Sequence, residues 1–368
     1  MHENSAIINA FDRNYYFKDP ITFPLKIKWR FKTDSVDRPL SQPLIHDDRI
    51  WLYAPLEKSG EPFGPAIVYE IDARSGEKIW EYTINEAGGW VSRNCVFNQM
   101  FMTSTKEKVI GLKNGRVSFT SKGESRRTKS IVCNNQHLFC SSDAGIAKLD
   151  SEGGLVKVFE KRRPTAITLS KNKIIFGASS SIYCLSADDL EIVWQTDVSE
   201  IGKHYEETKS RLLKKDIYAS GKLSGRYAAI SEGKVFCDVG RNVLCLNLEN
   251  GDVLWKGEAL GDPICAGEKI VSYDTVGNFY CLNSNTGELI SKTRPVEVHG
   301  LNASVPFVSD NSFFIGTDKI IAVDISNGDL LWQYQSEQSE TYFFDPVYVN
   351  GCLYTGCSDG HLYCFSQE

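Results

Sequence analysis

Eleven cysteines and six histidines are the side chains of this 368-residue chain best suited to nucleophilic or metal chemistry. Cys133 lies near Cys140 in sequence, and Cys352 near Cys357, but neither pair has zinc-ligand spacing and no matching Cys/His pair accompanies them. The histidines are scattered, and the chain contains neither an H-x-x-x-H nor a G-x-S-x-G hydrolase signature. We therefore expect no catalytic residue, no metal site and no cofactor.

Arginine pairs recur at a regular spacing and suit the bidentate binding of carboxylate or phosphate groups. Arg126 and Arg127 lie in the segment SKGESRRTK, and Arg162 and Arg163 lie 36 residues later in FEKRRPT. Arg93 occupies a similar place in the preceding unit. These five arginines predict a basic patch that binds a partner. The alternative is a solvated loop whose arginines pair with glutamates nearby in the same segments.

Three consecutive aromatic residues and one insertion supply the other candidates for partner contacts. Tyr342, Phe343 and Phe344 are adjacent, and neighbouring residues of a strand cannot all face the same side, so we expect at least one to be exposed. The alternative is that Phe343 or Phe344 begins the innermost strand of a sheet and is packed. Tyr205 lies in an insertion at about residues 200–224, whose middle is expected to form a short helix.

Composition places the chain among folded soluble proteins, with 42% hydrophobic and 24% charged residues. A net charge of -6 is too mild for a general nucleic-acid binder. The N-terminal residues lack the apolar run of a signal peptide, and no stretch approaches the roughly 20 apolar residues of a membrane span. We therefore expect a cytoplasmic protein with no nucleic-acid partner and no membrane span. The odd number of cysteines also fits a reducing compartment.

The elements that must position these residues follow from an internal repeat. Each copy is an alternating apolar run, a polar turn and a second apolar run, as in IYCLSADDLEIVW. This pattern predicts two antiparallel strands joined by a tight turn, in which glycine supplies the positive φ. Six full copies lie at 68–80, 146–158, 182–194, 243–255, 279–291 and 320–332, and a shortened one lies at 109–119. Their closing residues are Trp80, Val158, Trp194, Trp255, Ser291, Trp332 and, in the shortened copy, Phe119. Five of the six full copies carry a turn glycine, at Gly76, Gly154, Gly251, Gly287 and Gly328.

The repeat length predicts the architecture. The copies are about 40 residues apart, the length of a four-stranded propeller blade, and a closing tryptophan can fill the wedge between neighbouring blades. The strand KIKWRF (26–31) is expected to pair with the C-terminal strands of 352–365 and so close the ring. We predict an all-β, eight-bladed β-propeller of four-stranded antiparallel blades. It forms one domain over residues 24–368, preceded by a tail at 1–23, instead of the two domains that length alone suggests.

Four cysteines occupy one position of this repeat, immediately before its central apolar residue. They are Cys184, Cys245, Cys281 and Cys364. A cysteine in such a position behaves as a small hydrophobic side chain. We interpret these cysteines as packing residues.

The A-x-D-x-x-[TS/N]-G-[ED]-x-x-W pattern resembles the tryptophan-docking repeat of pyrroloquinoline-quinone-like propellers, over about residues 24–366. That superfamily includes quinoprotein dehydrogenases and the propeller lipoprotein of the bacterial outer-membrane barrel-assembly machinery. The quinone enzymes carry a vicinal Cys-Cys pair and a calcium-binding set, and this sequence has no adjacent cysteines and no recognisable calcium loop. The resemblance therefore implies the propeller fold without the enzyme residues.

Three functions stay open at this point. The preferred one is a non-catalytic, monomeric propeller that binds a protein partner through one decorated face; the resemblance extends this to a bacterial immunity protein or antitoxin that occludes a toxin or secretion-system effector. The second is a quinone-dependent or other small-molecule-binding propeller that uses the channel mouth. The third is a scaffold in outer-membrane protein assembly, which requires a lipoprotein leader.

Overall fold

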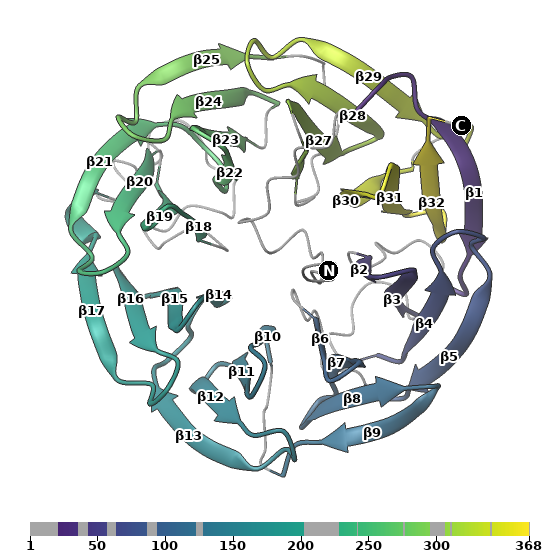
Figure 1. Ribbon diagram of the computed structural model, residues 1–368, viewed down its shortest axis with the longest axis horizontal. Helices are drawn as coiled ribbons and strands as arrows, with labels where there is room; N and C mark the ends of the chain where they lie inside the picture. Colours follow the sequence, from purple (N-terminus) through teal and green to yellow (C-terminus); the bar gives the residue numbers. More distant parts are fainter. Residues whose placement is uncertain are drawn as a thin grey trace, which may run out of the picture.

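The computed structural model describes residues 21–35, 43–56, 64–86, 94–122, 128–201, 228–240, 242–274, 277–294, 306–309, 311–338 and 341–367. These residues form eight four-stranded sheets, in which each strand pairs with its neighbour in the chain, apart from one exception at the chain ends. The sheets surround a central axis like the blades of a propeller (Figure 1). The predicted eight-bladed, all-β fold is confirmed.

In each blade the first strand given is the innermost and the last is the outermost. Blades one to four contain β2 (Leu44–His46), β3 (Arg49–Pro55), β4 (Ala66–Asp72) and β5 (Lys78–Ile84); β6 (Cys95–Phe97), β7 (Met100–Ser104), β8 (Val109–Lys113) and β9 (Arg116–Thr120); β10 (Ser130–Cys133), β11 (Leu138–Ser141), β12 (Gly145–Leu149) and β13 (Leu155–Glu160); and β14 (Thr168–Ser170), β15 (Lys173–Ala178), β16 (Ser181–Ser186) and β17 (Ile192–Asp197). Blades five to eight contain β18 (Ala229–Ser231), β19 (Lys234–Val239), β20 (Asn242–Asn247) and β21 (Val253–Glu258); β22 (Ile264–Ala266), β23 (Lys269–Tyr273), β24 (Phe279–Asn283) and β25 (Leu289–Thr293); β26 (Phe307–Ser309), β27 (Ser312–Gly316), β28 (Lys319–Asp324) and β29 (Leu330–Gln335); and β30 (Phe343–Val349), β31 (Cys352–Cys357), β32 (His361–Ser366) and β1 (Lys26–Lys32).

The ring closes where β1 becomes the outer strand of the eighth blade. It runs antiparallel to β32, with Trp29 opposite Cys364. Blade eight is also fastened to blade one, because the Trp29 indole and the Tyr354 hydroxyl both donate hydrogen bonds to the carbonyl of Ala73, at 3.3 and 3.2 Å. The predicted pairing of the N-terminal strand with the C-terminal strands is confirmed.

Adjacent blades are joined by the docking of closing tryptophans. The indole of Trp194 in blade four donates a 2.9 Å hydrogen bond to the carbonyl of Leu248 in blade five, and its ring lies against Gly251 of the same turn. Trp29 lies in the same way against Gly76, as the sequence pattern predicts. Trp194 and Trp29 thus each fill the wedge between their own blade and the next.

Blade three departs from the expected alignment. Lys157, not Val158, lies opposite the slot residue Lys148, so Lys157 occupies the position that tryptophan has elsewhere. The reason is a turn that is one residue shorter than expected, in which Gly153, and not Gly154, has the positive φ of 82°. The prediction of Val158 as the closing residue is therefore wrong by one position.

The core lies between the blades, and the cysteines of the repeat are part of it. Cys184, Cys245, Cys281 and Cys364 are all fully buried, in agreement with their interpretation as packing residues. Burial raises the pKa of the Cys184 and Cys245 thiols to about 12 and that of Cys281 to about 11. These three thiols are therefore protonated and unreactive at neutral pH.

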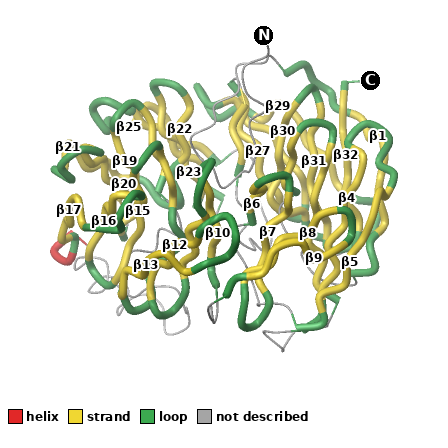
Figure 2. The backbone as a smooth tube through the Cα atoms, turned by 60° about the horizontal axis from the view of Figure 1, so that its bottom comes forward, coloured by secondary structure: helices red, strands yellow, loops and turns green. Residues whose placement is uncertain are grey.

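Strand direction divides the connections between two faces (Figure 2). The links from each outer strand to the next inner strand lie on one face, together with the turns between the second and third strands; we call this the link face. The remaining turns lie on the opposite face, which we call the hairpin face. In Figure 2 the link face is below, where the helical turn at residues 199–201 is drawn in red.

Candidate partner-binding face

Of the sequence-predicted contact residues, the structure describes Arg162, Arg163, Tyr342, Phe343 and Phe344, all at or near the link face. The others lie outside the described residues, as does the expected helix of the insertion: Arg93, Arg126, Arg127 and Tyr205. The described residues fall into two groups, one between blades three and four and one at blade eight.

The first group surrounds an open cleft of about 510 Å³ between blades three and four. Its walls are the turn at Asp143 and Ala144, the link that carries Arg162, and Ser179 of the next blade. Two backbone hydrogen bonds hold the link against the turn: Lys161 N–H donates to the Ala144 carbonyl at 3.1 Å, and Arg163 N–H donates to the Asp143 carbonyl at 3.0 Å. The arginines are thus mounted on an ordered backbone.

The lysines of this cleft already have partners. Lys129 forms an ion pair with Asp143 at 3.0 Å and donates to the Pro164 carbonyl at 3.1 Å. Lys161 donates to the Tyr183 hydroxyl, and its ammonium lies 4.5 Å from the centre of the tyrosine ring. These cations therefore stabilise the link and are less available to a ligand.

Arg162 and Arg163 differ from those lysines. Both are exposed, and within the described part of the chain neither guanidinium makes an ion pair or a side-chain hydrogen bond. Glu160 lines the same cleft without pairing to them. Of the two glutamates that the alternative interpretation offers as partners, Glu160 does not pair with these arginines, and Glu124 lies outside the described residues. A partner-binding role for the arginines stays a prediction.

The aromatic group at blade eight is mostly interior. Phe343 is 1% exposed and Phe344 is 7% exposed, and the Phe343 ring packs against Tyr334 and Tyr363 with centroids 5.8 and 5.5 Å away. Both phenylalanines begin the inner strand β30 and are packed, as the alternative interpretation has it. Tyr342 is half-buried, so it is the member of the three that reaches the surface.

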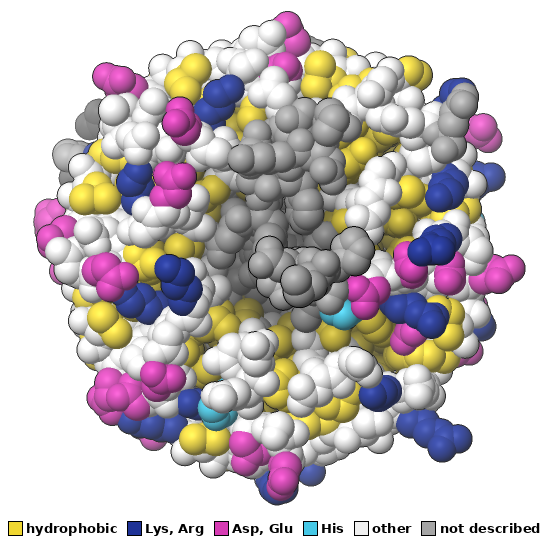
Figure 3. All heavy atoms as spheres, in the orientation of Figure 1, with side chains coloured by type: hydrophobic (Ala, Val, Ile, Leu, Met, Phe, Trp, Pro, Cys, Tyr) yellow, Lys and Arg dark blue, Asp and Glu magenta, His cyan; other side chains and the backbone are white. Residues whose placement is uncertain are grey.

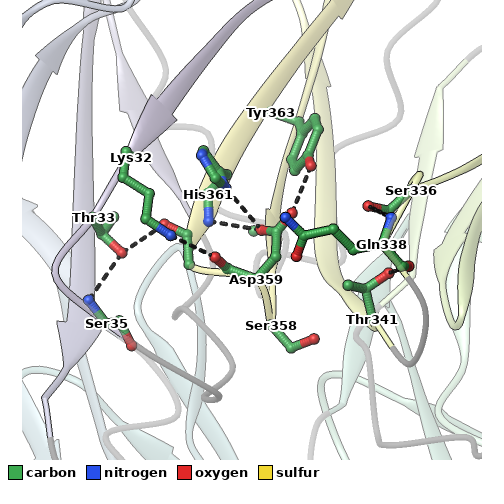
Figure 4. Close-up of polar contacts among 12 residues, drawn as sticks. Lys32, Thr33, Ser35, Ser336, Gln338, Thr341, Ser358, Asp359, His361 and Tyr363 are labelled. Atoms are coloured by element: carbon green, nitrogen blue, oxygen red, sulfur yellow. Dashed lines mark hydrogen bonds and ion pairs between the residues drawn. The ribbon is translucent and has the colours of Figure 1, made fainter.

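A polar network beside these aromatics was not anticipated from the sequence (Figure 4). The Tyr363 hydroxyl donates to Asp359 Oδ2 at 2.6 Å, and the backbone N–H of His361 donates to Asp359 Oδ1 at 2.9 Å. Lys32 of β1 donates to the Asp359 carbonyl at 2.8 Å. Burial and the neighbouring carboxylate raise the pKa of Tyr363, so its hydroxyl stays a donor. The network fixes the turn between β31 and β32.

The same device recurs in blade six, where the Tyr280 hydroxyl donates to Asp274 Oδ2 at 3.0 Å. Its sequence signal is an aspartate in the turn and a tyrosine a few residues later in the third strand. The recurrence indicates a structural role. Ser358 lies away from His361 (Figure 4), and its hydroxyl accepts the Tyr342 N–H at 2.9 Å, so the Asp359–His361 pair does not activate it as a nucleophile.

The hairpin face contrasts with the arginine cleft. Figure 3 looks onto this face, where positive and negative side chains are mixed around the ring. Arg74 pairs with Asp48 at 2.7 Å, and ion pairs also join neighbouring blades, Lys157 to Glu191 and Lys173 to Glu249. The charged side chains of these pairs are engaged with one another and are therefore less available to a partner than Arg162 and Arg163.

The described residues include no cluster of three or more His, Cys, Asp or Glu side chains placed to hold a metal ion. Over the same part of the chain, no helix has the length and apolar character needed to cross a bilayer.

Comparison with known proteins points to one family. A family model described as outer membrane protein assembly factor BamB matches residues 178–368. Among curated proteins, the outer membrane protein assembly factor BamB of Yersinia pestis is 26% identical over an alignment of 199 residues that covers 49% of this chain and 48% of that protein. The chain thus spans about half the length of the curated relative it matches.

Solved structures share the fold over nearly the whole chain. BamB from Moraxella catarrhalis superposes with a TM-score of 0.69 at 14% identity, over 93% of this chain and 100% of that one. Sqt1 from Chaetomium thermophilum superposes with a TM-score of 0.67 at 12% identity, over 93% and 100%. At such low identity these likenesses establish the fold alone.

Proposed function

The chain belongs to the family described as outer membrane protein assembly factor BamB, and from this premise we propose that it is a non-catalytic scaffold that binds a protein partner through its link face. The observation that carries the proposal is the exposed pair Arg162 and Arg163, which makes no ion pair within the described residues. Charged side chains of the hairpin face, in contrast, neutralise one another.

Arginine side chains are frequent among the residues that dominate protein interfaces, because one guanidinium combines charge, several donors and a flat apolar surface. The cleft between blades three and four offers a hollow lined by one such side chain, Arg162, with the exposed Arg163 next to it in sequence. Tyr342, at the surface of blade eight, is a second contact point on the same face. An acidic or carboxylate-bearing segment of the partner would complement this arrangement.

Two finer roles fit a scaffold of this kind and name different partners. In the first, the chain takes part in outer-membrane protein assembly and binds another component of that assembly; family membership favours this role. In the second, it is a cytoplasmic immunity protein that occludes a toxin or secretion-system effector. The identity and compartment of the recovered partner separate the two.

The experiment is a pull-down with the full chain after cross-linking in its native host, followed by binding measurements on the recovered partner. Arg162→Glu with Arg163→Glu should weaken binding at least tenfold. The matched control is Arg74→Glu with Lys78→Glu, which makes the same change in charge at exposed positions of the hairpin face and should alter affinity less than twofold. Equal losses in both double variants, or no loss in either, would remove the arginine cleft from the interface.

The quinone alternative has its own test. Titration calorimetry with pyrroloquinoline quinone and calcium should give no heat of binding. Saturable heat would instead support a small-molecule-binding propeller.

A further inference from the structure

Two cysteines lie side by side at the seam where the ring closes. Cys352 of β31 is opposite Ser366 of β32, and Tyr354 is opposite Cys364. Because side chains two residues apart in a strand face the same side, Cys352 and Cys364 are diagonal neighbours on one side of the blade. Both are free thiols in the structure.

A lysine from the third strand of this seam reaches the pair. The register of β1 against β32 shifts between Ile27 and Trp29, so that Lys28 is an extra residue in the outer strand. Its ammonium lies 4.0 Å from Cys352 Sγ. Tyr354, two residues from Cys352 in β31, faces the same side of the blade, but its hydroxyl donates to the carbonyl of Ala73. Cys352 therefore has one thiol, from β32, and one cation, from β1, beside it.

This environment stabilises a thiolate at Cys352. The neighbouring Cys364 thiol, with further help from Lys28, lowers the pKa of Cys352 against the opposing effect of burial, while Cys352 and burial raise the pKa of Cys364. The pair therefore gives up its first proton readily and retains its second. Burial raises the pKa of Cys281, in the same repeat position as Cys364 on blade six, to about 11, against a smaller opposing effect of Lys269.

Exposure assigns the order in which the two sulfurs react. Cys352 is 7% exposed, whereas Cys364 is completely buried. A small oxidant therefore reaches Cys352 first. Cys364, beside it and shielded, is placed to attack whatever forms on Cys352 and not to react with the oxidant itself.

We propose that Cys352 and Cys364 form a peroxide-reactive dithiol, in which Cys352 is oxidised first and Cys364 then closes a disulfide between β31 and β32. The Cys352 thiolate attacks one oxygen of hydrogen peroxide; the O–O bond breaks, and the hydroxide that leaves takes up the proton lost from Cys352 to become water. The product is a sulfenic acid. The Cys364 sulfur then attacks the Cys352 sulfur, the S–O bond breaks, and the departing oxygen leaves as water with the Cys364 proton. Two thiols are oxidised and one peroxide is reduced to two waters.

The modification is tested on the full, reduced chain with hydrogen peroxide as the probe. After alkylation of the remaining thiols and proteolysis, peptide mass spectrometry should find Cys352 and Cys364 linked, with a loss of two hydrogens. Cys352→Ser and Cys364→Ser should each abolish this product. Cys281→Ser, the matched control in the repeat position, should leave its rate unchanged.

A variant that retains both cysteines keeps the test informative if a serine variant folds poorly. Lys28→Met should slow formation of the linked product at least fivefold at neutral pH and move its rate profile to higher pH, because the thiolate loses its cation. The proposal is overturned if peroxide links other cysteines equally fast. It is also overturned if no Cys352–Cys364 product forms, or if Lys28→Met reacts at the wild-type rate.

Discussion

Gly251 of blade five lies directly against the indole ring of Trp194 in blade four. A Cβ at position 251 would come within 2.6 Å of two ring atoms, and the backbone there has a φ of +75°. Gly287 stands in the same relation to Trp255. The glycine of the turn therefore meets two requirements, one from its own backbone and one from the neighbouring blade.

Comparing Gly251→Ala with Gly233→Ala should separate the cost of the positive φ from the cost of a clash with the Trp194 ring. Gly233 has the same φ of +75° but nothing within 4 Å of a Cβ, so its replacement costs only the backbone strain, about 1 kcal/mol. Gly251→Ala should cost a further ~1–3 kcal/mol, because the ring must move. Denaturant unfolding of both variants measures the difference, and equal losses would show that the ring yields freely.

Replacing the closing tryptophans by phenylalanine should distinguish blades that are otherwise alike. Trp194→Phe removes the hydrogen bond to the Leu248 carbonyl. Trp80→Phe removes a buried indole N–H that has no partner among the described residues, because the next blade has only a short turn between β8 and β9. Trp194→Phe should therefore destabilise the chain by about 1–2 kcal/mol more. Chemical denaturation tests this, and a larger loss from Trp80→Phe would contradict it.

The fold was predictable because every blade repeats the same local constraints. The alternating strands, the turn and the closing tryptophan of residues 182–194 recur at nearly constant spacing, so one correct interpretation of a unit carries over to most of the ring. The error at Lys157 arose where blade three shortens its turn by one residue. A turn that is one residue shorter cannot be recognised from the sequence when the residues on either side of it are all apolar or charged.

The candidate site was less predictable, because it depends on which side chains find partners. Arg162 and Lys161 are adjacent and equally charged in the sequence, yet Lys161 is held by Tyr183 and Arg162 is exposed. Phe343 and Phe344 were ambiguous, since adjacent aromatics suit an inner strand and an interface equally. The proximity of Cys352 and Cys364 follows only from the register of β31 against β32.

Acid should weaken the turns of the hairpin face. Three carboxyl groups in these turns have a pKa below the usual value of 3.8, because each accepts hydrogen bonds from backbone N–H groups. The largest effect comes from the N–H of Ser75 for Asp72, from that of Gly154 for Asp150 and from that of Glu191 for Asp189.

Because the folded pKa is the lower one, the stability these carboxylates contribute is complete above about pH 4 and is lost as pH falls through the folded pKa. The melting temperature of the triple variant Asp72→Asn, Asp150→Asn and Asp189→Asn should therefore fall less between pH 4 and pH 2 than that of the wild type. Thermal melts of both proteins over a series of pH values measure this. If melting temperature falls equally with pH in both, these turns have no role in acid sensitivity.

At the seam, the tryptophan of blade seven docks on a different partner. Because the fourth strand of blade eight is β1, no hairpin turn joins it to β32 within the described residues. Trp332 instead stacks on Phe23, just before β1, with ring centroids 6.3 Å apart and an interplanar angle of 22°. Phe23 also contacts the ring of Phe314. The residues before β1 therefore supply the docking surface that a turn glycine provides in other blades.

Phe23→Ala should loosen the closing strand more than it loosens the rest of the ring. We expect a loss of about 2 kcal/mol of stability, since much of one aromatic side chain is uncovered, and faster amide exchange along β1 and β32 than along β19 and β20. Ile27→Ala, which alters an exposed residue of the same strand, is the matched control and should change exchange little. Hydrogen exchange mass spectrometry resolves these strands. Uniformly faster exchange in all blades would mean that Phe23 supports global stability and not the closure of the ring.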